Sequence, residues 1–523
     1  MLTKNDDQET TYIVGGGLAG IMLAYRLAVR AQQSGKAIPH ITLIDRHAAP
    51  SSATSHAYGG FISANSYETI TFSSSQQASK KLNTPWQSQG GWSTHTPPTE
   101  SETRWMDEVI HLSDRPAHEK ESDRLLYHHF GYGCIQLWQE LMHAHPKLAK
   151  DSGFNYTSGE NRGGVLRIYE EDCGKSPEED MAFLHKTGND GLHTCRVSKD
   201  ELSEYSDLTN HYGDSAQYVR QHGGNVNGDV VCKQMLGLLN QMGAKIEFMD
   251  STEVEGIEYA HNAPRINALR IKDASGKIKS IGKFTDRFVF ATGPDQKLWK
   301  SLGFASSPVM GVSGTSLTVP VPDDFNGPKP MHPLKFLDKN GGPVMIPVND
   351  AQGKKFIRIG GYTAFTGDRT PTTDDDFAHD FLLRQYQLLH KLYPELAERF
   401  LRDELHGNIN NLSNYSGSWV GQRPVTADNH AIVGRQSIPE AHGRSTANAV
   451  DSENSYLLTG MGAAGLLSLG AADILAQQMD GSEAIDVRGA TNEQESNAIL
   501  AMISPNRLAT FMAKTQSVGP TAQ

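Results

Sequence analysis

Ile13-Val14-Gly15-Gly16-Gly17-Leu18-Ala19-Gly20 contains the spacing G-x-G-x-x-G, and the fold of this 523-residue chain can be worked out from this stretch. The apolar run Thr11 to Val14 before the glycines predicts a short buried strand, and a helix is expected from about Leu18 to Arg30. A second strand is predicted at Ile41 to Ile44 and ends at Asp45. A strand, a helix and a strand in such close succession predict two parallel strands.

Each glycine of this stretch has its own physical role. Gly15 permits a tight turn, Gly17 lets a pyrophosphate approach the backbone, and Gly20 lets the helix pack closely on the strand. The helix N-terminus offers N–H groups and a positive dipole end to phosphates, and Asp45 can bind ribose hydroxyls. The stretch therefore predicts a dinucleotide site. Asp45 favours FAD or NAD over NADP, and the alternative is a turn that serves packing alone.

Similar elements recur later in the chain. A helix is expected to open at Asp229 as its N-cap, a buried strand runs from Arg287 into a turn at Gly293, and strand, glycine turn and helix follow Tyr456. The alternation from Pro308 to Thr366 predicts an antiparallel sheet. Two interleaved domains are therefore predicted. Their boundaries are 1–75, 220–305 and 410–500 for the dinucleotide domain, 76–219 and 306–409 for the second domain, and 501–523 for a C-terminal tail.

Other segments give coarser predictions. Residues 48–100 are rich in Ser, Thr, Gly and His and predict a loop. Apolar residues at steps of three and four predict a helix over 121–144, which Pro146 ends. Residues 266–271 and 277–284 predict a hairpin around Asp273-Ala274-Ser275-Gly276.

Composition limits the possible functions. The chain is 37% hydrophobic and 21% charged, which suits a packed core, and its net charge is -12. This acidic balance argues against a nucleic-acid partner, which needs clustered Lys and Arg. No run approaches the ~18 uncharged apolar residues of a transmembrane helix. The nearest run, Gly462 to Met479, contains Asp473 and is expected to form a buried helix.

The ends, cysteines and histidines give further expectations. Residues 1–9 are polar and lack the order of a signal peptide, so a cytoplasmic location is expected, although contact with a membrane surface is compatible with the sequence. His128-His129 and His143-Ala144-His145 lie about fourteen residues, roughly 20 Å, apart on one predicted helix and cannot share an ion, so no metal is expected. The cysteines, none in a CxxC pair, are Cys134, Cys173, Cys195 and Cys232.

The C-terminal third contains the run Trp419-Val420-Gly421-Gln422-Arg423-Pro424-Val425-Thr426-Ala427-Asp428-Asn429-His430-Ala431-Ile432-Val433-Gly434 and a glycine turn in Tyr456 to Gly465. Upstream lie Gly224 to Asp229, Phe290 to Gly293 and Arg358 to Tyr362. In order along the chain, these stretches resemble the D-amino-acid oxidase superfamily of FAD-dependent oxidoreductases, whose motif G-x-R-P-x-T-x-D-x-x-P-x-x-G is similar to the first run. The chain looks most like the D-amino-acid dehydrogenase small subunit and related glycine and sarcosine oxidases.

The resemblance implies an α/β fold. A doubly wound, Rossmann-like FAD domain of the glutathione-reductase type is interleaved with an α+β substrate domain built on an antiparallel sheet. It also implies FAD contacts across the chain. The residues expected to bind FAD are Gly15, Gly17, Leu18, Ala19, Gly20, Asp45, Arg46, Gly60, Ala291, Thr292, Gly293, Gly460, Met461, Gly462, Ala463, Ala464 and Gly465.

The chain also departs from the family pattern. Ala431 stands where the motif usually has proline, and Met461 stands where the dehydrogenases commonly have histidine. The polar stretch from Ser63 to Glu121 has no clear counterpart. No cysteine follows Cys232, so the C-terminal cysteinyl flavin link of some sarcosine oxidases cannot form. FAD is therefore expected to be non-covalent, unless a histidine provides a link.

Five residues are candidates for the substrate site. Arg423 is the first candidate for a carboxylate clamp, with an ordinary salt bridge as the alternative. Arg358 is the second, and a solvated strand arginine is the alternative. Tyr362 could bind a carboxylate or serve as a core aromatic. His56 and Tyr58 lie in a loop that contacts the flavin in the family, and solvent-facing side chains are the alternative.

The expected reaction is oxidation of the C–N bond of an amino acid or secondary amine, by hydride transfer to flavin N5. The cofactor performs this step, so a strong protein base is not required. The turn Gly460 to Gly465, at the head of a helix, is expected to stabilise charge on the flavin. Oxygen or a quinone is the electron acceptor. The alternatives are 2-hydroxy-acid or glycerol-phosphate oxidation, or a flavin-carrying subunit of a larger complex.

Overall fold

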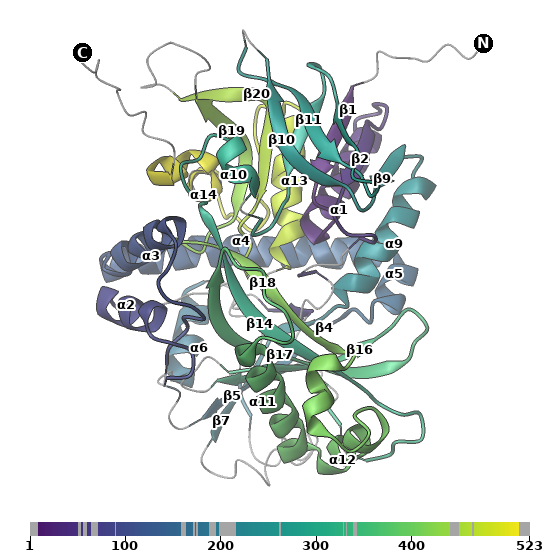
Figure 1. Cartoon of the computed structure of the whole chain (residues 1–523), viewed down its shortest axis with the longest axis vertical. Helices are drawn as coiled ribbons and strands as arrows, with labels where there is room; N and C mark the ends of the chain where they lie inside the picture. Colours follow the sequence, from purple (N-terminus) through teal and green to yellow (C-terminus); the bar gives the residue numbers. More distant parts are fainter. Residues whose placement is uncertain are drawn as a thin grey trace.

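A computed structural model gives the arrangement of most of the chain (Figure 1). The residues it describes are 9–50, 54–55, 60–63, 72–88, 90–157, 164–170, 173, 176–187, 195–197, 216–260, 263–295, 297–327, 329–330, 332–337, 342–439, 449–462 and 465–511.

A six-stranded sheet forms the first layer, and its order confirms the parallel arrangement predicted around the glycine stretch. The order is β19-β20-β13-β1-β2-β9, and every neighbouring pair is parallel except β19 and β20. The strands are β1 (Thr10–Val14), β2 (His40–Ile44), β9 (Ile246–Met249), β13 (Arg287–Phe290), β19 (Ile432–Pro439) and β20 (Ala449–Thr459).

Each face of this sheet is covered by different elements. On one face, Ile13 and Leu43 pack in a core with the helices α1 (Leu18–Gln33), α9 (Gly228–Gln241) and α13 (Leu467–Met479). On the other face, Phe288 packs in a core with a three-stranded antiparallel sheet. That sheet consists of β10 (Glu253–Tyr259), β11 (Ile266–Lys272) and β12 (Ile278–Ile281), and it contains the predicted hairpin.

An eight-stranded sheet forms the second large layer and lies below the first in Figure 1. Its order is β18-β14-β17-β16-β15-β5-β7-β6, and all neighbours are antiparallel except β15 and β5. The strands are β5 (Val165–Glu170), β6 (Cys195–Arg196), β7 (Ala216–Gln221), β14 (Val309–Pro320), β15 (Leu334–Leu337), β16 (Val344–Asn349), β17 (Lys355–Gly367) and β18 (Ser418–Thr426).

Helices cover the outer face of this sheet and connect the layers. Leu317 and Ile359 pack in a core with α11 (Asp376–Leu392) and α12 (Pro394–Asp403). The long helix α4 (Ala117–Ala144) crosses the middle of the molecule, and its Trp138 Nε1 donates a hydrogen bond to Leu466 O over 2.8 Å. The remaining elements are β3 (Phe61–Ile62), β4 (Asn155–Thr157), β8 (Gly223–Asn225), α2 (Ser75–Asn83), α3 (Glu100–Ser113), α5 (Pro146–Asp151), α6 (Pro177–Lys186), α10 (Lys297–Ser301), α14 (Glu493–Ile503), η3 (Ile409–Asn414) and η4 (Pro505–Phe511).

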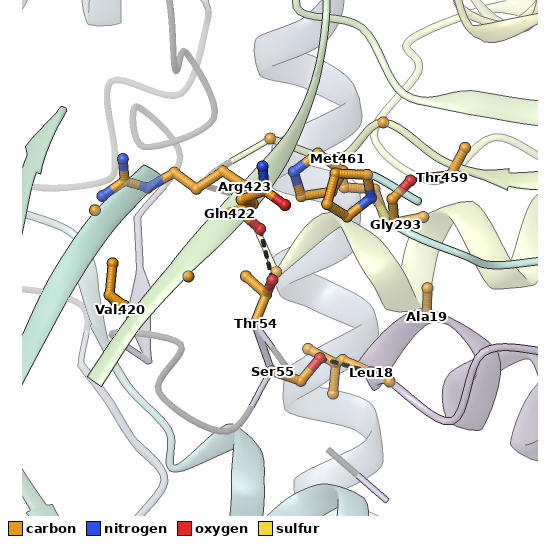
Figure 2. Close-up of a pocket in the computed structure, with 18 of the residues that line it drawn as sticks. Leu18, Ala19, Thr54, Ser55, Gly293, Val420, Gln422, Arg423, Thr459 and Met461 are labelled. Carbon is orange, nitrogen blue, oxygen red and sulfur yellow. Dashed lines mark hydrogen bonds between the residues drawn. The ribbon is translucent and has the colours of Figure 1, made fainter. Parts of the chain in front are cut away.

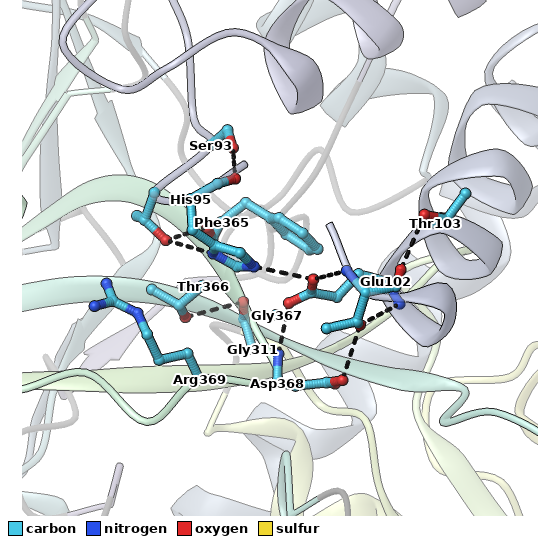
Figure 3. Close-up of polar contacts among 12 residues, drawn as sticks. Ser93, His95, Glu102, Thr103, Gly311, Phe365, Thr366, Gly367, Asp368 and Arg369 are labelled. Atoms are coloured by element: carbon cyan, nitrogen blue, oxygen red, sulfur yellow. Dashed lines mark hydrogen bonds and ion pairs between the residues drawn. The ribbon is translucent and has the colours of Figure 1, made fainter. Parts of the chain in front are cut away.

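The prediction of a loop over residues 48–100 was wrong in part, because α2 and the first residue of α3 lie within it. Helix α3 begins with a capping box between Thr99 and Glu102. The buried Glu102 carboxylate also accepts hydrogen bonds from His95 Nε2 (3.0 Å) and from the backbone N–H of Asp368 (2.9 Å), which joins α3 to the end of β17 (Figure 3). Burial alone would raise the pKa of Glu102, but these hydrogen bonds hold it below its ordinary value.

Two other predictions need correction. Asn227, not Asp229, is the N-cap of α9, and Asp229 lies in the first turn, where it pairs with Lys233 Nζ at 2.7 Å. The start of the predicted C-terminal tail is not a tail: η4 buries Leu508, and Arg507 donates to both carboxylate oxygens of Asp428 over 2.6 and 3.2 Å. The other domain boundaries stay a prediction.

Helix α13 confirms the buried helix expected in the most apolar part of the sequence. Among the helices that the structure describes, none combines the length and the apolar character needed to cross a bilayer.

Candidate active site

A cavity of about 1030 Å³ lies between the carboxyl ends of the parallel strands and one face of the eight-stranded sheet. Most of the residues expected at the site line it. These are Gly15, Gly17, Leu18, Ala19, Asp45, Arg46, Ala291, Thr292, Gly293, Tyr362, Arg423, Gly460, Met461, Gly462 and Gly465.

Some expected site residues lie elsewhere. Gly20, Gly60 and Arg358 are not among the described residues that line the cavity. Gly60 packs against the backbone of Val226 instead, where a Cβ atom would lie 2.0 Å from Val226 O. Four others, His56, Tyr58, Ala463 and Ala464, lie outside the described residues.

The glycine loop between β1 and α1 has the geometry predicted for it. Gly15 has a φ of 118°, and a Cβ atom there would lie 2.3 Å from Ala291 O. A Cβ atom at Gly20 would lie 2.1 Å from Gly15 O, so this glycine allows the close helix packing. Gly17 differs from both, because its φ is -79° and its Cβ direction leads into the cavity, with Ser55 Oγ as the nearest neighbour at 3.2 Å. The loop therefore leaves room for a phosphate at Gly17.

Two polar side chains, Asp45 and Ser55, flank the space beside Gly17. Asp45 accepts hydrogen bonds from the backbone N–H of Gly16 (2.6 Å) and of His47 (2.8 Å), which fix its carboxylate at the cavity wall. Ser55 Oγ accepts a hydrogen bond from the N–H of Leu18 (2.9 Å), the first residue of α1 (Figure 2). Neighbouring Thr54 donates to Gln422 O over 2.5 Å. We did not predict Thr54 and Ser55, because no motif distinguishes them from the other hydroxyl residues of the loop.

The C-terminal turn closes the cavity beside the glycine loop. Gly460 and Gly462 have φ values of 74° and 56°, and Gly462 N–H donates to Pro424 O over 2.8 Å. Thr459 Oγ1 donates to Gly293 O over 3.2 Å, so the turns after β13 and β20 are joined. Since α13 begins just beyond Gly465, its positive dipole end lies near this wall. A phosphate-sized opening at one helix N-terminus and a second helix N-terminus nearby fit FAD.

Arg423 extends from β18, away from Met461 and Gly293 (Figure 2). Its guanidinium donates to Tyr362 O (3.2 and 3.3 Å) and to Ser313 O (3.3 Å). These acceptors are neutral, and no carboxylate pairs with Arg423 within the described part of the chain. Burial lowers the pKa of Arg423 to about 10, so the group is still charged near neutral pH. A partly buried cation at a cavity wall with neutral partners suits an anionic ligand.

The backbone carbonyl of Tyr362 holds the Arg423 guanidinium in place. Tyr362 lies in a bulge of β17 opposite Ser313 to Thr315, and its φ is 57°, which is left-handed and uncommon for a residue other than glycine. This conformation accompanies the contact between its carbonyl and Arg423. The ring lies 5.3 Å from the ring of Phe381, so it also packs in the small aromatic cluster beneath the cavity.

We expect the backbone of Tyr362 to matter more than its ring. Tyr362→Asn and Tyr362→Val both remove the ring, but Asn tolerates a left-handed φ whereas the β-branched Val does not. The Asn variant should keep KM for a carboxylate substrate within about threefold, and the Val variant should raise it about tenfold or more, because strain of about 1–2 kcal/mol displaces the carbonyl. Steady-state kinetics of both variants test this. Equal losses would show that the ring carries the effect.

Arg358 does not join this group. It is buried on β17, and its Nε lies 3.4 Å from Thr318 Oγ1. Burial lowers its pKa to about 10, and the nearby charge of Asp229 opposes that shift. The prediction that Arg358 lies at the substrate site is therefore wrong, because it is not a residue of the cavity wall. The alternative, a solvent-exposed strand arginine, is wrong as well, because the side chain is buried.

The fold and the cavity define a dinucleotide-binding enzyme of the α/β class. The DAO family model, described as FAD dependent oxidoreductase, matches residues 11–478. The chain therefore belongs to this family of FAD-dependent oxidoreductases.

Solved structures share this fold. Glycine oxidase from Geobacillus kaustophilus is 15% identical, with a TM-score of 0.56, and the match covers 97% of this chain and 100% of that one. L-alpha-glycerophosphate oxidase from Mycoplasma pneumoniae is 15% identical, with a TM-score of 0.53 and coverage of 92% and 98%. L-amino acid deaminase from Proteus vulgaris, with its specific insertion sequence deleted, is 14% identical, with a TM-score of 0.52 and coverage of 96% and 94%. At these identities the likeness shows the fold.

Proposed function

We propose that this enzyme oxidises the C–N bond of an amino acid or of a secondary amine that carries a carboxylate. The observation that carries the proposal is the partly buried Arg423 guanidinium, whose described partners are two neutral carbonyl groups at the cavity wall. Names of proteins with the same fold, glycine oxidase and L-amino acid deaminase, support the substrate class.

The residues of the chain would bind and orient the substrate. Arg423 presents a planar fork that matches a carboxylate, and the carbonyls of Tyr362 and Ser313 fix that fork in place. A bound FAD would supply the acceptor for the hydride that leaves the substrate carbon. The N–H groups at the start of α13 supply positive potential where negative charge develops. The product is an imine, which water hydrolyses.

Three finer expectations belong to the same proposal. FAD is held without a covalent bond, since no cysteine follows Cys232 in the sequence, and denaturation should release free FAD, whereas flavin that stays on the polypeptide would show a histidine link. Oxygen or a quinone accepts the electrons, and a stopped-flow comparison of the two would identify which. A cytoplasmic location stays a prediction.

Anaerobic bleaching of the flavin tests the substrate class. Purified protein is mixed without oxygen with D- and L-amino acids, sarcosine, 2-hydroxy acids and glycerol phosphate, and absorbance near 450 nm is followed. Bleaching by amines is the expected result. Arg423 would clamp a 2-hydroxy acid equally well, so oxidation of such acids is the second candidate, and bleaching by hydroxy compounds alone would support it. A flavin that no small molecule reduces would indicate a flavin-carrying subunit.

A further inference from the structure

A row of paired residues crosses the eight-stranded sheet beneath the cavity. Arg167 pairs with Lys335, Lys335 with Val344, and Val344 with Gly360. Residues paired across neighbouring strands share one face of the sheet. All four line the cavity, so Arg167 and Lys335 lie side by side on its floor.

Arg167 is only 7% exposed, and it is one of the residues that line the cavity. Nη1 donates to Asp180 Oδ2 (2.6 Å) and to Tyr169 Oη (3.4 Å). Nε and Nη2 form no hydrogen bond to any described residue. Asp180 is also 3.7 Å from Arg124, so Arg167 shares this carboxylate with a second guanidinium. The contact with Asp180 orients Arg167, and its two remaining nitrogens can receive an anion.

Lys335 adds a second cation to this floor. Its Nζ donates to Gly342 O over 3.0 Å, which keeps the ammonium beside the cavity. The neighbouring strands are about 4.8 Å apart, so both cations can contact one acidic group. Among the described residues that line the cavity, the carboxylates are Asp45, Glu253 and Asp295, and these belong to the dinucleotide side of the molecule. Among the described residues that line the cavity, Arg167 and Lys335 are therefore the charged groups of the floor.

This pair is separate from the Arg423 clamp. Arg423 contacts Tyr362, which lies two residues beyond Gly360 on β17. Arg167 lies on β5, three strands away from Gly360 in the sheet. Three strand spacings correspond to about 14 Å between backbones. Long side chains shorten that gap, but two anions of one ligand would still be separated by several bonds.

Resting on the proposed function, we propose that Arg167 and Lys335 form a second anion site, and that the substrate is an amine with two carboxylates. Arg423 binds the carboxylate beside the reacting carbon, and Arg167 with Lys335 binds the distal one. Secondary amines in which nitrogen joins two carboxylate-bearing chains have the required length.

Binding of unreactive diacids tests the second site without turnover. Unbranched α,ω-dicarboxylates of five to ten carbons are titrated into the FAD-loaded enzyme, and the change in flavin absorbance gives Kd. Each diacid is compared with its monoamide, which has the same length but one charge fewer. At the best length, the diacid should bind at least tenfold more tightly. Equal affinities at every length would overturn the proposal.

Variants assign this preference to the two residues. Lys335→Gln should reduce the preference for the diacid at least fivefold. Arg167→Lys should do the same, because it keeps a charge for Asp180 but loses the fork. Thermal unfolding shows that each variant is folded. Lys354→Gln removes an exposed cation just before β17 and should keep the preference for the diacid. Loss of that preference in the Lys354 variant would also overturn the proposal.

Catalysis separates this inference from the proposed function. N-(carboxyalkyl) amino acids should bleach the flavin with a lower KM than their monoamides, and Lys335→Gln should remove the difference. If the N-(carboxyalkyl) amino acids and their monoamides reduce the flavin equally well, the second anion site is wrong but the proposed function stands. If no amine reduces the flavin, the proposed function fails, whereas the diacid titration still reports on the site.

Discussion

Gly17→Val is expected to give a folded protein that retains no FAD. The backbone at Gly17 is extended, with a φ of -79° and a ψ of -176°, so a β-branched residue can adopt it without strain. Its Cβ direction leads toward the cavity, with Ser55 Oγ at 3.2 Å, so a valine side chain would occupy the place where a pyrophosphate approaches. We expect FAD affinity to fall at least a hundredfold, about 2.7 kcal/mol.

The ratio of absorbance at 450 nm to that at 280 nm measures retained flavin, and titration with FAD measures affinity. Gly237→Ala in α9 is the matched control, because a Cβ atom there meets nothing within 4 Å. This control should keep its flavin. Circular dichroism should show that the Gly17 variant is folded. A yellow Gly17→Val protein with unchanged affinity would contradict the placement of the pyrophosphate.

Arg423→Ala is expected to raise KM for a carboxylate substrate while FAD stays bound. Removing one member of a buried charge pair costs about 2–4 kcal/mol, which corresponds to roughly a 30- to 1000-fold change. The loss should fall on KM more than on kcat, because Arg423 binds a group away from the reacting bond. Steady-state kinetics, with flavin content measured in parallel, check this result.

Two controls show whether the carboxylate is what Arg423 recognises. Arg423→Lys keeps a charge but loses the planar fork, so its KM should lie between those of the wild type and the Ala variant. An amine substrate without a carboxylate should be oxidised equally well, or equally poorly, by all three proteins. Unchanged kinetics in Arg423→Ala would remove this residue from the substrate site.

The sequence was most informative where the chemistry is local. The turn at Gly15 and the Asp45 carboxylate at the cavity wall could be predicted, because a glycine loop, a helix start and a strand end lie within one short segment. Arg423 could be proposed from its motif, but its neutral partners could not. The capping box at Thr99 was a readable signal for α3, yet the polar composition around it concealed the helix.

The sequence by itself determined the parallel FAD fold and the oxidoreductase family, because glycine spacing, helix periodicity and strand ends act over a few residues. The tertiary structure alone decided that Arg358 lies away from the cavity wall and that Arg167 lies beside Lys335. These positions depend on the order and register of strands far apart in the chain. Register sets which side chains share a face, and no local pattern in a single sequence specifies it.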